Sequence, residues 1–280
     1  MSLLPLHHPV DLVEQLAVLD VVSGGRLEVG IGRGGTLQDY QTFQSDREDS
    51  RARVEEGIAL MRQCWSGAPF DFQGRFHSAE GLHVRPRPTQ RPHPPLYIAA
   101  NSEDSVRSAA LLGLPTQSSF FVPVDELRRR HDVFREAATA AGRTAAEIET
   151  LERRSWGMRV VHVAPDRGEA LAAVEPAFMG YQRKMASLRS DATGGSVPNS
   201  FDRSLLRLRS FQSYLDDGWA IVGTPGEVRD GLQFYLLATG YQRVLLLMAL
   251  PGLDTRHALR SMRLFASDVA PALTRDLQRA

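Results

Sequence analysis

The sequence predicts an α/β protein built on a parallel sheet. Short apolar segments bounded by glycine or proline, typical of buried parallel strands, alternate with longer segments of helical periodicity. Because parallel strands need long crossover connections, the intervening helices fit this arrangement. Five strands are expected, over residues 26–32, 96–101, 114–119, 157–164 and 243–249. A doubly wound sheet and an incomplete (β/α)8 barrel both satisfy this count.

Composition and charge narrow the class of protein. The chain has 280 residues, of which 42% are hydrophobic, and this is enough for a substantial core. Lys plus Arg and Asp plus Glu both number 33, so the net charge favours neither nucleic acid nor a membrane surface as partner. Cys64 is the single cysteine, and neither a signal peptide nor a membrane-spanning apolar run is found. We expect a reduced, cytoplasmic protein that binds a small ligand.

The helices have recognisable start and stop signals. Pro9 opens the first helix, His8 is expected to cap it, and the "SGG" at 23–25 ends it. Thr224 and Glu227 form a capping box that starts a later helix. Further helices are expected over 47–65, 103–112, 125–141, 167–188 and from 254 to the C-terminus.

One segment departs from the alternation. Residues 189–219 are polar and rich in glycine and serine, which is typical of a long functional loop. We therefore predict one domain over residues 1–280, with a lid-like insertion at 189–219.

The loop "VGIGRGGTLQDY" at 29–40 contains the pattern G-x-G-x-x-G. A dinucleotide site needs the third glycine, Gly35, to open a helix, but no apolar helical period is visible for the next dozen residues. A glycine-rich turn and a phosphate site at the end of a parallel strand remain. Arg33 favours the phosphate site, because its guanidinium is placed one residue beyond the strand, where it can bind a phosphate with two hydrogen bonds.

A second polar group follows the next strand. Asn101, Ser102 and Ser105 lie between the end of "LYIAAN" and the start of a helix, where hydroxyl groups and free helical N–H groups converge. Ser102 is alternatively a plain helix cap. Polar residues follow two strands whose ends are expected at the same edge of the sheet. This favours a site in which both groups bind one anion. His7 and His8 lack a third ligand at a useful spacing, so no metal site is predicted.

Several stretches together resemble the bacterial luciferase-like flavin-dependent monooxygenase family. They are "LPLHHPVDLVEQLAVLDVVSGGRLEVGIGRG", "FQSDREDSRARVEEGIALMRQCW", "PPLYIAANSEDSVRSAALLGLP", "VGTPGEV" and "SMRLFASDVAPAL". The resemblance covers nearly the whole chain apart from residues 189–219, and the order and spacing of the stretches also agree.

The resemblance implies a (β/α)8 TIM barrel that binds reduced FMN, or coenzyme F420 in sister branches. By position, Arg33 is similar to the family's phosphate-binding arginine, and Gly35 would offer its backbone N–H. Asn101 and Ser102 match a pair that meets the phosphate, although a glutamate usually stands at the first of these positions, and Ser105 matches a hydroxyl of the same cluster. No catalytic residue is carried over.

The main departure from the family lies at the start of the chain. In the family, "LPLHHPV" follows directly on the third barrel strand, so strands 4 to 8 are expected here and strands 1 to 3 are expected to be missing. The part before this segment usually carries the luciferase branch's catalytic histidine. An incomplete barrel would expose strand edges, which is unfavourable unless they are covered.

Three functions follow from the resemblance. The first is a monooxygenase that uses reduced FMN and O2 on a small organic substrate, with a separate flavin reductase and a homodimeric assembly. The second is an F420-dependent reductase or dehydrogenase. The third is a non-catalytic flavin-binding or subunit-like protein.

Overall fold

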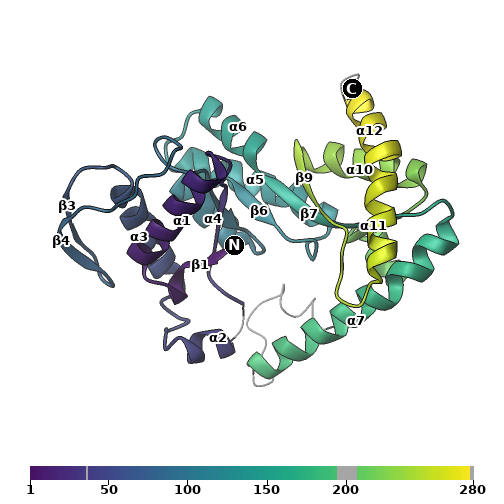
Figure 1. The fold of residues 1–280 in the computed structure, drawn as a ribbon, viewed down its shortest axis with the longest axis horizontal. Helices are drawn as coiled ribbons and strands as arrows, with labels where there is room; N and C mark the ends of the chain where they lie inside the picture. The colour runs from purple at the N-terminus through teal and green to yellow at the C-terminus, as the bar shows by residue number, and fades with distance from the viewer. Residues whose placement is uncertain (36, 194–206, 278–280) are drawn as a thin grey trace. The chain divides into compact units, whose positions relative to one another are not determined.

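The computed structural model describes residues 1–35, 37–193 and 207–277. The chain divides into two compact units, Met1–Ala99 and Ala100–Ala280, and each is described here by itself. Figure 1 labels the helices and strands.

The N-terminal unit contains a small parallel sheet and an antiparallel hairpin. The strand β2 pairs in parallel with β1 on one side and β5 on the other, so that Ile31 lies opposite both Ser2 and Ile98. The hairpin joins β3 to β4. In chain order the elements are β1 (Ser2–Leu3), η1 (Leu4–Leu6), α1 (Pro9–Ser23), β2 (Val29–Gly32), α2 (Leu37–Thr42), α3 (Ser50–Cys64), β3 (Phe70–Gln73), β4 (Ser78–Leu82) and β5 (Leu96–Ala99).

The ends of α1 are fixed by local interactions. Nδ1 of His8 accepts a hydrogen bond from the backbone N–H of Val10 at 3.3 Å, and Pro9 occupies the first turn. At the other end, Gly24 adopts a left-handed conformation with φ of 67°. The predicted cap at His8 is confirmed. Between these ends, α1 packs against α3 and buries Val13 and Ala17 completely.

Glu56 joins α3 to the hairpin. Its carboxylate accepts hydrogen bonds from the backbone N–H groups of Arg75, Phe76 and His77 at 2.7–2.9 Å. Oε1 also lies 2.9 Å from Nδ1 of His77. A partly buried carboxylate is stabilised when it accepts several backbone hydrogen bonds, so this contact fixes the tip of the hairpin on the helix.

The C-terminal unit is built around the strand β7. Its registers place Trp156 opposite Gln117 of β6, and place Val160 opposite both Ala220 of β8 and Leu247 of β9, all in parallel. The elements are α4 (Glu103–Leu112), β6 (Thr116–Ser118), α5 (Val124–Ala140), α6 (Ala145–Arg154), β7 (Trp156–Val163), α7 (Arg167–Thr193), α9 (Phe211–Asp216), β8 (Ala220–Gly223), α10 (Pro225–Thr239), β9 (Arg243–Leu247), α11 (Thr255–Leu264), the π-helical turn η2 (Phe265–Val269) and α12 (Ala270–Leu277).

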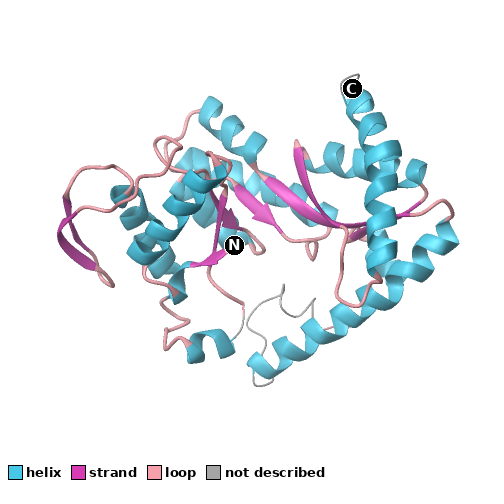
Figure 2. Ribbon diagram, viewed as in Figure 1, coloured by secondary structure: helices cyan, strands magenta, loops and turns pink. Residues whose placement is uncertain are grey.

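Both faces of β7 are buried. Val160 belongs to a cluster that includes Phe178 of α7 and Trp219 before β8, whereas Val161 and Val163 belong to a second cluster that includes residues of α10. Alternate residues of a strand point to opposite faces, so β7 separates two hydrophobic cores. Helices α7, α10 and α11 lie around β7, β8 and β9 (Figure 2).

Helix α11 is joined to this sheet by a side chain. Oγ of Ser261 on α11 accepts a hydrogen bond from the backbone N–H of Val163 at 2.8 Å, and Ser261 is fully buried. Helix α11 continues through η2 into α12, coloured yellow in Figure 1. Among the described residues, no helix is long and apolar enough to cross a membrane.

The structure confirms the five predicted strands as β2, β5, β6, β7 and β9. It adds the hairpin, β8 and the two-residue strand β1, none of which was predicted. The capping box of Thr224 and Glu227 is confirmed, since each side chain accepts a hydrogen bond from the other residue's backbone N–H.

Two expectations need correction or restriction. No helix was predicted directly after Gly35, yet α2 begins at Leu37, because the buried aromatic ring of Tyr40 anchors this short segment to the unit. Of the predicted lid-like insertion at 189–219, residues 194–206 lie outside the described residues. The described end of the insertion includes α9, whose Phe211 and Tyr214 are buried in the core. The lid function itself stays a prediction.

Candidate functional site

Arg33 follows the last residue of β2 and is exposed. The next residue, Gly34, has φ of 97°, a conformation that disfavours any residue with a Cβ. A Cβ at Gly34 would also lie 3.5 Å from the ring of Tyr40, whereas Gly35 is exposed and has open space around it. The chain therefore turns sharply after Arg33 and leaves the guanidinium and the Gly35 backbone accessible.

Tyr40 contacts the backbone of this turn. Its ring is 2% exposed, and its hydroxyl donates a hydrogen bond to the backbone carbonyl of Arg33. This contact has no signal in the sequence, because nothing in the local pattern shows that the side chain of Tyr40 folds back onto a residue seven positions upstream. A helix does follow Gly35, but α2 has six residues and is shorter than the helix whose N-terminus holds the pyrophosphate in a dinucleotide-binding fold.

Ser102 and Ser105 form a capping box at the start of α4 in the C-terminal unit. Oγ of Ser102 accepts from the N–H of Ser105 at 3.4 Å, and Oγ of Ser105 accepts from the N–H of Ser102 at 3.0 Å. The capping interpretation of Ser102 is therefore confirmed. Both hydroxyls are only partly buried, and the helix brings its first N–H groups to the same place.

Asn101 lies beside this cap and is also engaged. Its Oδ1 accepts a hydrogen bond from the backbone N–H of Ser119 at 2.8 Å, which links the ends of two successive strands. With Oδ1 occupied, the amide group has its Nδ2 hydrogens to offer to a ligand. Asn101 is therefore suited to donate to an anion.

Ser119 was missed by the sequence prediction. Its Oγ is buried and has no hydrogen-bond partner among the described residues, which is unusual for a buried hydroxyl. Ser119 follows β6 directly, so the rule that drew attention to Arg33 and Asn101, a polar residue at the carboxyl end of a parallel strand, would also have found it.

The five predicted residues divide between the two units. Arg33 and Gly35 belong to the N-terminal unit, and Asn101, Ser102 and Ser105 belong to the C-terminal unit. The structure describes each group within its own unit, so their convergence on one phosphate stays a prediction.

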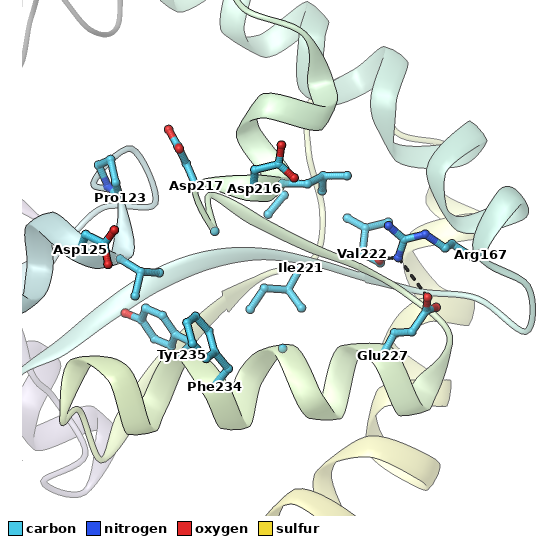
Figure 3. Close-up of a pocket in the computed structure, with 15 residues that line it drawn as sticks. Pro123, Asp125, Arg167, Asp216, Asp217, Ile221, Val222, Glu227, Phe234 and Tyr235 are labelled. Carbon is cyan, nitrogen blue, oxygen red and sulfur yellow. Dashed lines mark hydrogen bonds and ion pairs between the residues drawn. The ribbon is translucent and has the colours of Figure 1, made fainter.

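A cavity of about 330 Å³ in the C-terminal unit contains none of the predicted residues (Figure 3). Ile221 and Phe234 contribute apolar surface to it, and an ion pair between Arg167 and Glu227 at 3.1 Å lies at one side. Its lining also includes Asp125, Asp216 and Asp217. Because these carboxylates repel a phosphate, the cavity is no candidate for the phosphate site.

Parallel strands joined by helices place the chain in the class of parallel α/β proteins. The chain belongs to the luciferase-like monooxygenase family, whose model matches residues 1–242.

Curated relatives include monooxygenases. The chain is 28% identical over 271 residues to 4-hydroxyprotoasukamycin monooxygenase of Streptomyces nodosus subsp. asukaensis, covering 96% of this chain and 71% of the relative. It is 26% identical over 281 residues to the alkanal monooxygenase alpha chain of Photorhabdus laumondii subsp. laumondii, covering 96% and 76%. It is also 30% identical over 115 residues to the oxygenase component of the flavin-dependent trigonelline monooxygenase of Acinetobacter baylyi, covering 40% and 32%.

Solved structures share the fold. Monooxygenase RslO1 from Streptomyces bottropensis is 28% identical, with a TM-score of 0.79 over 97% of this chain and 76% of that chain. The oxygenating constituent of 3,6-diketocamphane monooxygenase from Pseudomonas putida, in complex with FMN, has a TM-score of 0.72 at 23% identity, over 96% and 77%. The coenzyme F420-dependent tetrahydromethanopterin reductase from Methanopyrus kandleri has a TM-score of 0.68 at 18% identity, over 95% and 80%. The last two similarities show the fold alone.

Proposed function

We propose that the protein is a flavin-dependent monooxygenase that binds reduced FMN and uses O2 to oxygenate a small organic substrate. The observation that carries the proposal is the exposed Arg33, set by a glycine turn at the carboxyl end of a parallel strand. Ligands of parallel α/β sheets bind at this edge. Membership of a family whose relatives are monooxygenases supports the reaction class.

Strand pairing supports a phosphate site made from two loops. β2 and β5 are parallel neighbours in register, so their carboxyl ends leave the same edge of the sheet. Arg33 follows one end directly, and the chain reaches Asn101 two residues after the other end at Ala99. Both loops therefore follow the carboxyl ends of parallel strands, where α/β proteins bind ligands.

The residues suit a phosphate monoester. Arg33 supplies a charged donor, Gly35 leaves its backbone N–H open because it carries no side chain, and the start of α4 supplies further N–H groups. The hydroxyls of Ser102 and Ser105 and the amide of Asn101 add neutral hydrogen-bond donors. The donor set is cationic and neutral, without a carboxylate among the five residues.

Bound reduced flavin supplies the electrons with which O2 is activated. The protein's residues contribute binding and orientation: Arg33 neutralises the phosphate charge, and the glycines at 34 and 35 allow the cofactor close to the backbone. We assign no proton transfer to a residue.

Partners and location follow from the same proposal. A separate flavin reductase supplies reduced FMN, as the term "oxygenase component" in the name of the trigonelline enzyme suggests for that relative. The assembly is a homodimer in the cytoplasm.

Anaerobic titration tests the proposal. Reduced FMN and reduced F420 are each added to the protein, and binding is followed by absorbance and fluorescence before air is admitted. We expect binding of FMN and faster oxygen uptake with substrate candidates present. Binding of F420 with hydride transfer would replace the proposal by an F420-dependent reductase or dehydrogenase. Binding of FMN without turnover would indicate a flavin-binding subunit.

A paired substitution tests the phosphate site. Arg33→Ala is expected to weaken FMN binding by about 10- to 100-fold, the loss of a charge-assisted contact. Arg85, an exposed arginine in the same unit, provides the matched control in Arg85→Ala, which should leave FMN binding unchanged. Equal affinities of the Arg33→Ala variant and the unchanged protein would refute the assignment.

A further inference from the structure

The Tyr40 hydroxyl donates a hydrogen bond to the loop that carries Arg33. Tyr40 lies on α2, its side chain is 2% exposed, and its hydroxyl donates to the backbone carbonyl of Arg33. A buried phenol hydroxyl needs such an acceptor, because an unpaired one is costly. The bond therefore ties the position of the Arg33 peptide group to α2.

The Tyr40 ring packs against the same turn. The Cβ position of Gly34 would lie 3.5 Å from Tyr40 Cε2, so the ring packs directly against this glycine. Gly34 needs φ of 97°, and this conformation points the Arg33 carbonyl toward the phenol. Ring and hydroxyl together fix two consecutive residues of the loop.

We propose that Tyr40 is a positioning residue for the phosphate of the cofactor, acting through Arg33. The inference rests on the proposed function, since it assumes that Arg33 binds the phosphate. Tyr40 itself is buried beneath the loop and does not contact the ligand. It holds the Arg33 backbone in place, so that less conformational freedom is lost when the guanidinium binds.

This role has a specific signature. Riboflavin has the same ring system as FMN but no phosphate, so a residue that acts through Arg33 affects the affinity for FMN and not that for riboflavin. A residue that only stabilises the unit affects both ligands alike, or neither.

The experiment compares Tyr40→Phe, Arg33→Ala and the double variant, each titrated with reduced FMN and with reduced riboflavin. Tyr40→Phe keeps the ring against Gly34 and removes only the hydroxyl. We expect FMN binding to weaken by about 3- to 10-fold, the range of one hydrogen bond, with riboflavin binding unchanged. In the Arg33→Ala background, Tyr40→Phe should have less than about a twofold further effect, since coupled residues are not additive.

The outcomes separate this inference from the proposed function. No effect of Arg33→Ala on FMN binding refutes both the phosphate assignment and any action of Tyr40 through it. Weaker FMN binding in Arg33→Ala, with no FMN-selective loss in Tyr40→Phe, refutes the Tyr40 role alone. Additive effects in the double variant also refute it.

Two further variants secure the result. Tyr214→Phe removes a buried hydroxyl that accepts from the backbone N–H of Arg209 in the C-terminal unit, and it should leave the preference for FMN over riboflavin unchanged. If Tyr40→Phe does not fold, Gly34→Ala strains the same turn while keeping the hydroxyl. An FMN-selective loss in Gly34→Ala supports the inference, and equal loss for both ligands refutes it.

Discussion

The carboxylate of Glu56 contacts His77 twice, with Oε1 lying 2.8 Å from the backbone nitrogen and 2.9 Å from Nδ1. The two residues are 21 positions apart, and they join the helix α3 to the turn between β3 and β4. The carboxylate therefore anchors the hairpin to the helix, beside the Arg53 guanidinium over the Phe76 ring and the Arg75–Asp49 ion pair.

Replacing Glu56 by Gln should destabilise the protein by about 1–3 kcal/mol, because the backbone donors lose a charged acceptor. The measurement is urea unfolding followed by circular dichroism. Glu48→Gln, at an exposed position in the same unit, serves as the control. Equal stabilities of the Glu56 variant and the unchanged protein would contradict the role assigned to this contact.

The Glu56 carboxylate should make the free energy of unfolding depend on pH in the acidic range. Burial raises the pKa of Glu56, but hydrogen bonds from His77, Phe76 and Arg75 outweigh it, so the net pKa lies below the ordinary value of 4.5. A carboxyl whose pKa is lowered by folding stabilises the protein above pH 4.5, and this contribution is lost as the pH falls through the folded-state pKa. The loss should be smaller in Glu56→Gln.

Tyr235→Phe should leave stability unchanged or raise it by about 1 kcal/mol. The hydroxyl of Tyr235 is buried without a hydrogen-bond partner among the described residues, so its removal relieves a desolvation cost. The ring stays in place beneath the guanidinium of Arg159, whose Cζ lies 4.3 Å from the ring centroid. Thermal unfolding measures the effect, and a loss of more than about 1 kcal/mol would show that the hydroxyl has a partner.

Gly157 provides a paired test of the same contact. A Cβ at Gly157 would lie 2.0 Å from the Tyr235 hydroxyl, so Gly157→Ala should destabilise the C-terminal unit by about 1–3 kcal/mol, as overpacking does. Combining it with Tyr235→Phe should recover part of the loss. Absence of any recovery would place the cost elsewhere, for example at Tyr241, whose ring is 3.2 Å away.

His162 should make the C-terminal unit sensitive to mild acid. It is 1% exposed and its Nδ1 has no partner in the described part of the chain. Burial, and secondarily the charge of His257, lower the pKa of His162 below 6.5. Protons then bind the unfolded state preferentially below pH 6.5, and stability falls by up to about 1.4 kcal/mol per pH unit until the folded-state pKa is reached.

Unfolding at pH 7.5 and 5.5 tests this prediction. His162→Gln should lose less stability between these two values than the unchanged protein. His131 is partly buried and its pKa is also lowered by burial, so some sensitivity should persist. The exposed His83 supplies the control variant His83→Gln. If that control and His162→Gln respond alike to pH, His162 is not the sensitive group.

Local signals were the most reliable part of the sequence prediction. The caps at His8, Ser102 and Thr224 depend on residues within three positions, and the structure has all three. The five strands were found because buried parallel strands are short, apolar and bounded by glycine or proline. Rules of this kind need no knowledge of distant partners.

Features set by distant contacts were missed. Helix α2 has six residues and no apolar periodicity of its own, and it is anchored by the buried ring of Tyr40. Glu56 and Arg159 look like surface residues in the sequence, because their partners are remote or lie in the backbone. Trp219 ends a polar stretch of the sequence, yet it is buried, because its partners in the core are distant along the chain.

The candidate site was predicted in part. Arg33 and Asn101 were recognised because polar residues stand at the ends of two predicted strands. In the structure Arg33 directly follows β2 and Asn101 lies two residues after β5, and their binding role stays a prediction. The contacts that hold these residues, from Tyr40 and Ser119, connect segments 7 and 18 positions apart and have no local signature.

The bond between Ser261 and the N–H of Val163 has a kinetic consequence. Because this amide of β7 donates to a helix and not to a neighbouring strand, its hydrogen is shielded from solvent only while α11 is docked. Its isotope exchange rate should therefore report detachment of the C-terminal helix while the rest of β7 stays protected. The exchange rate of the Val163 amide would therefore detect a partial opening of the structure that global unfolding experiments do not resolve.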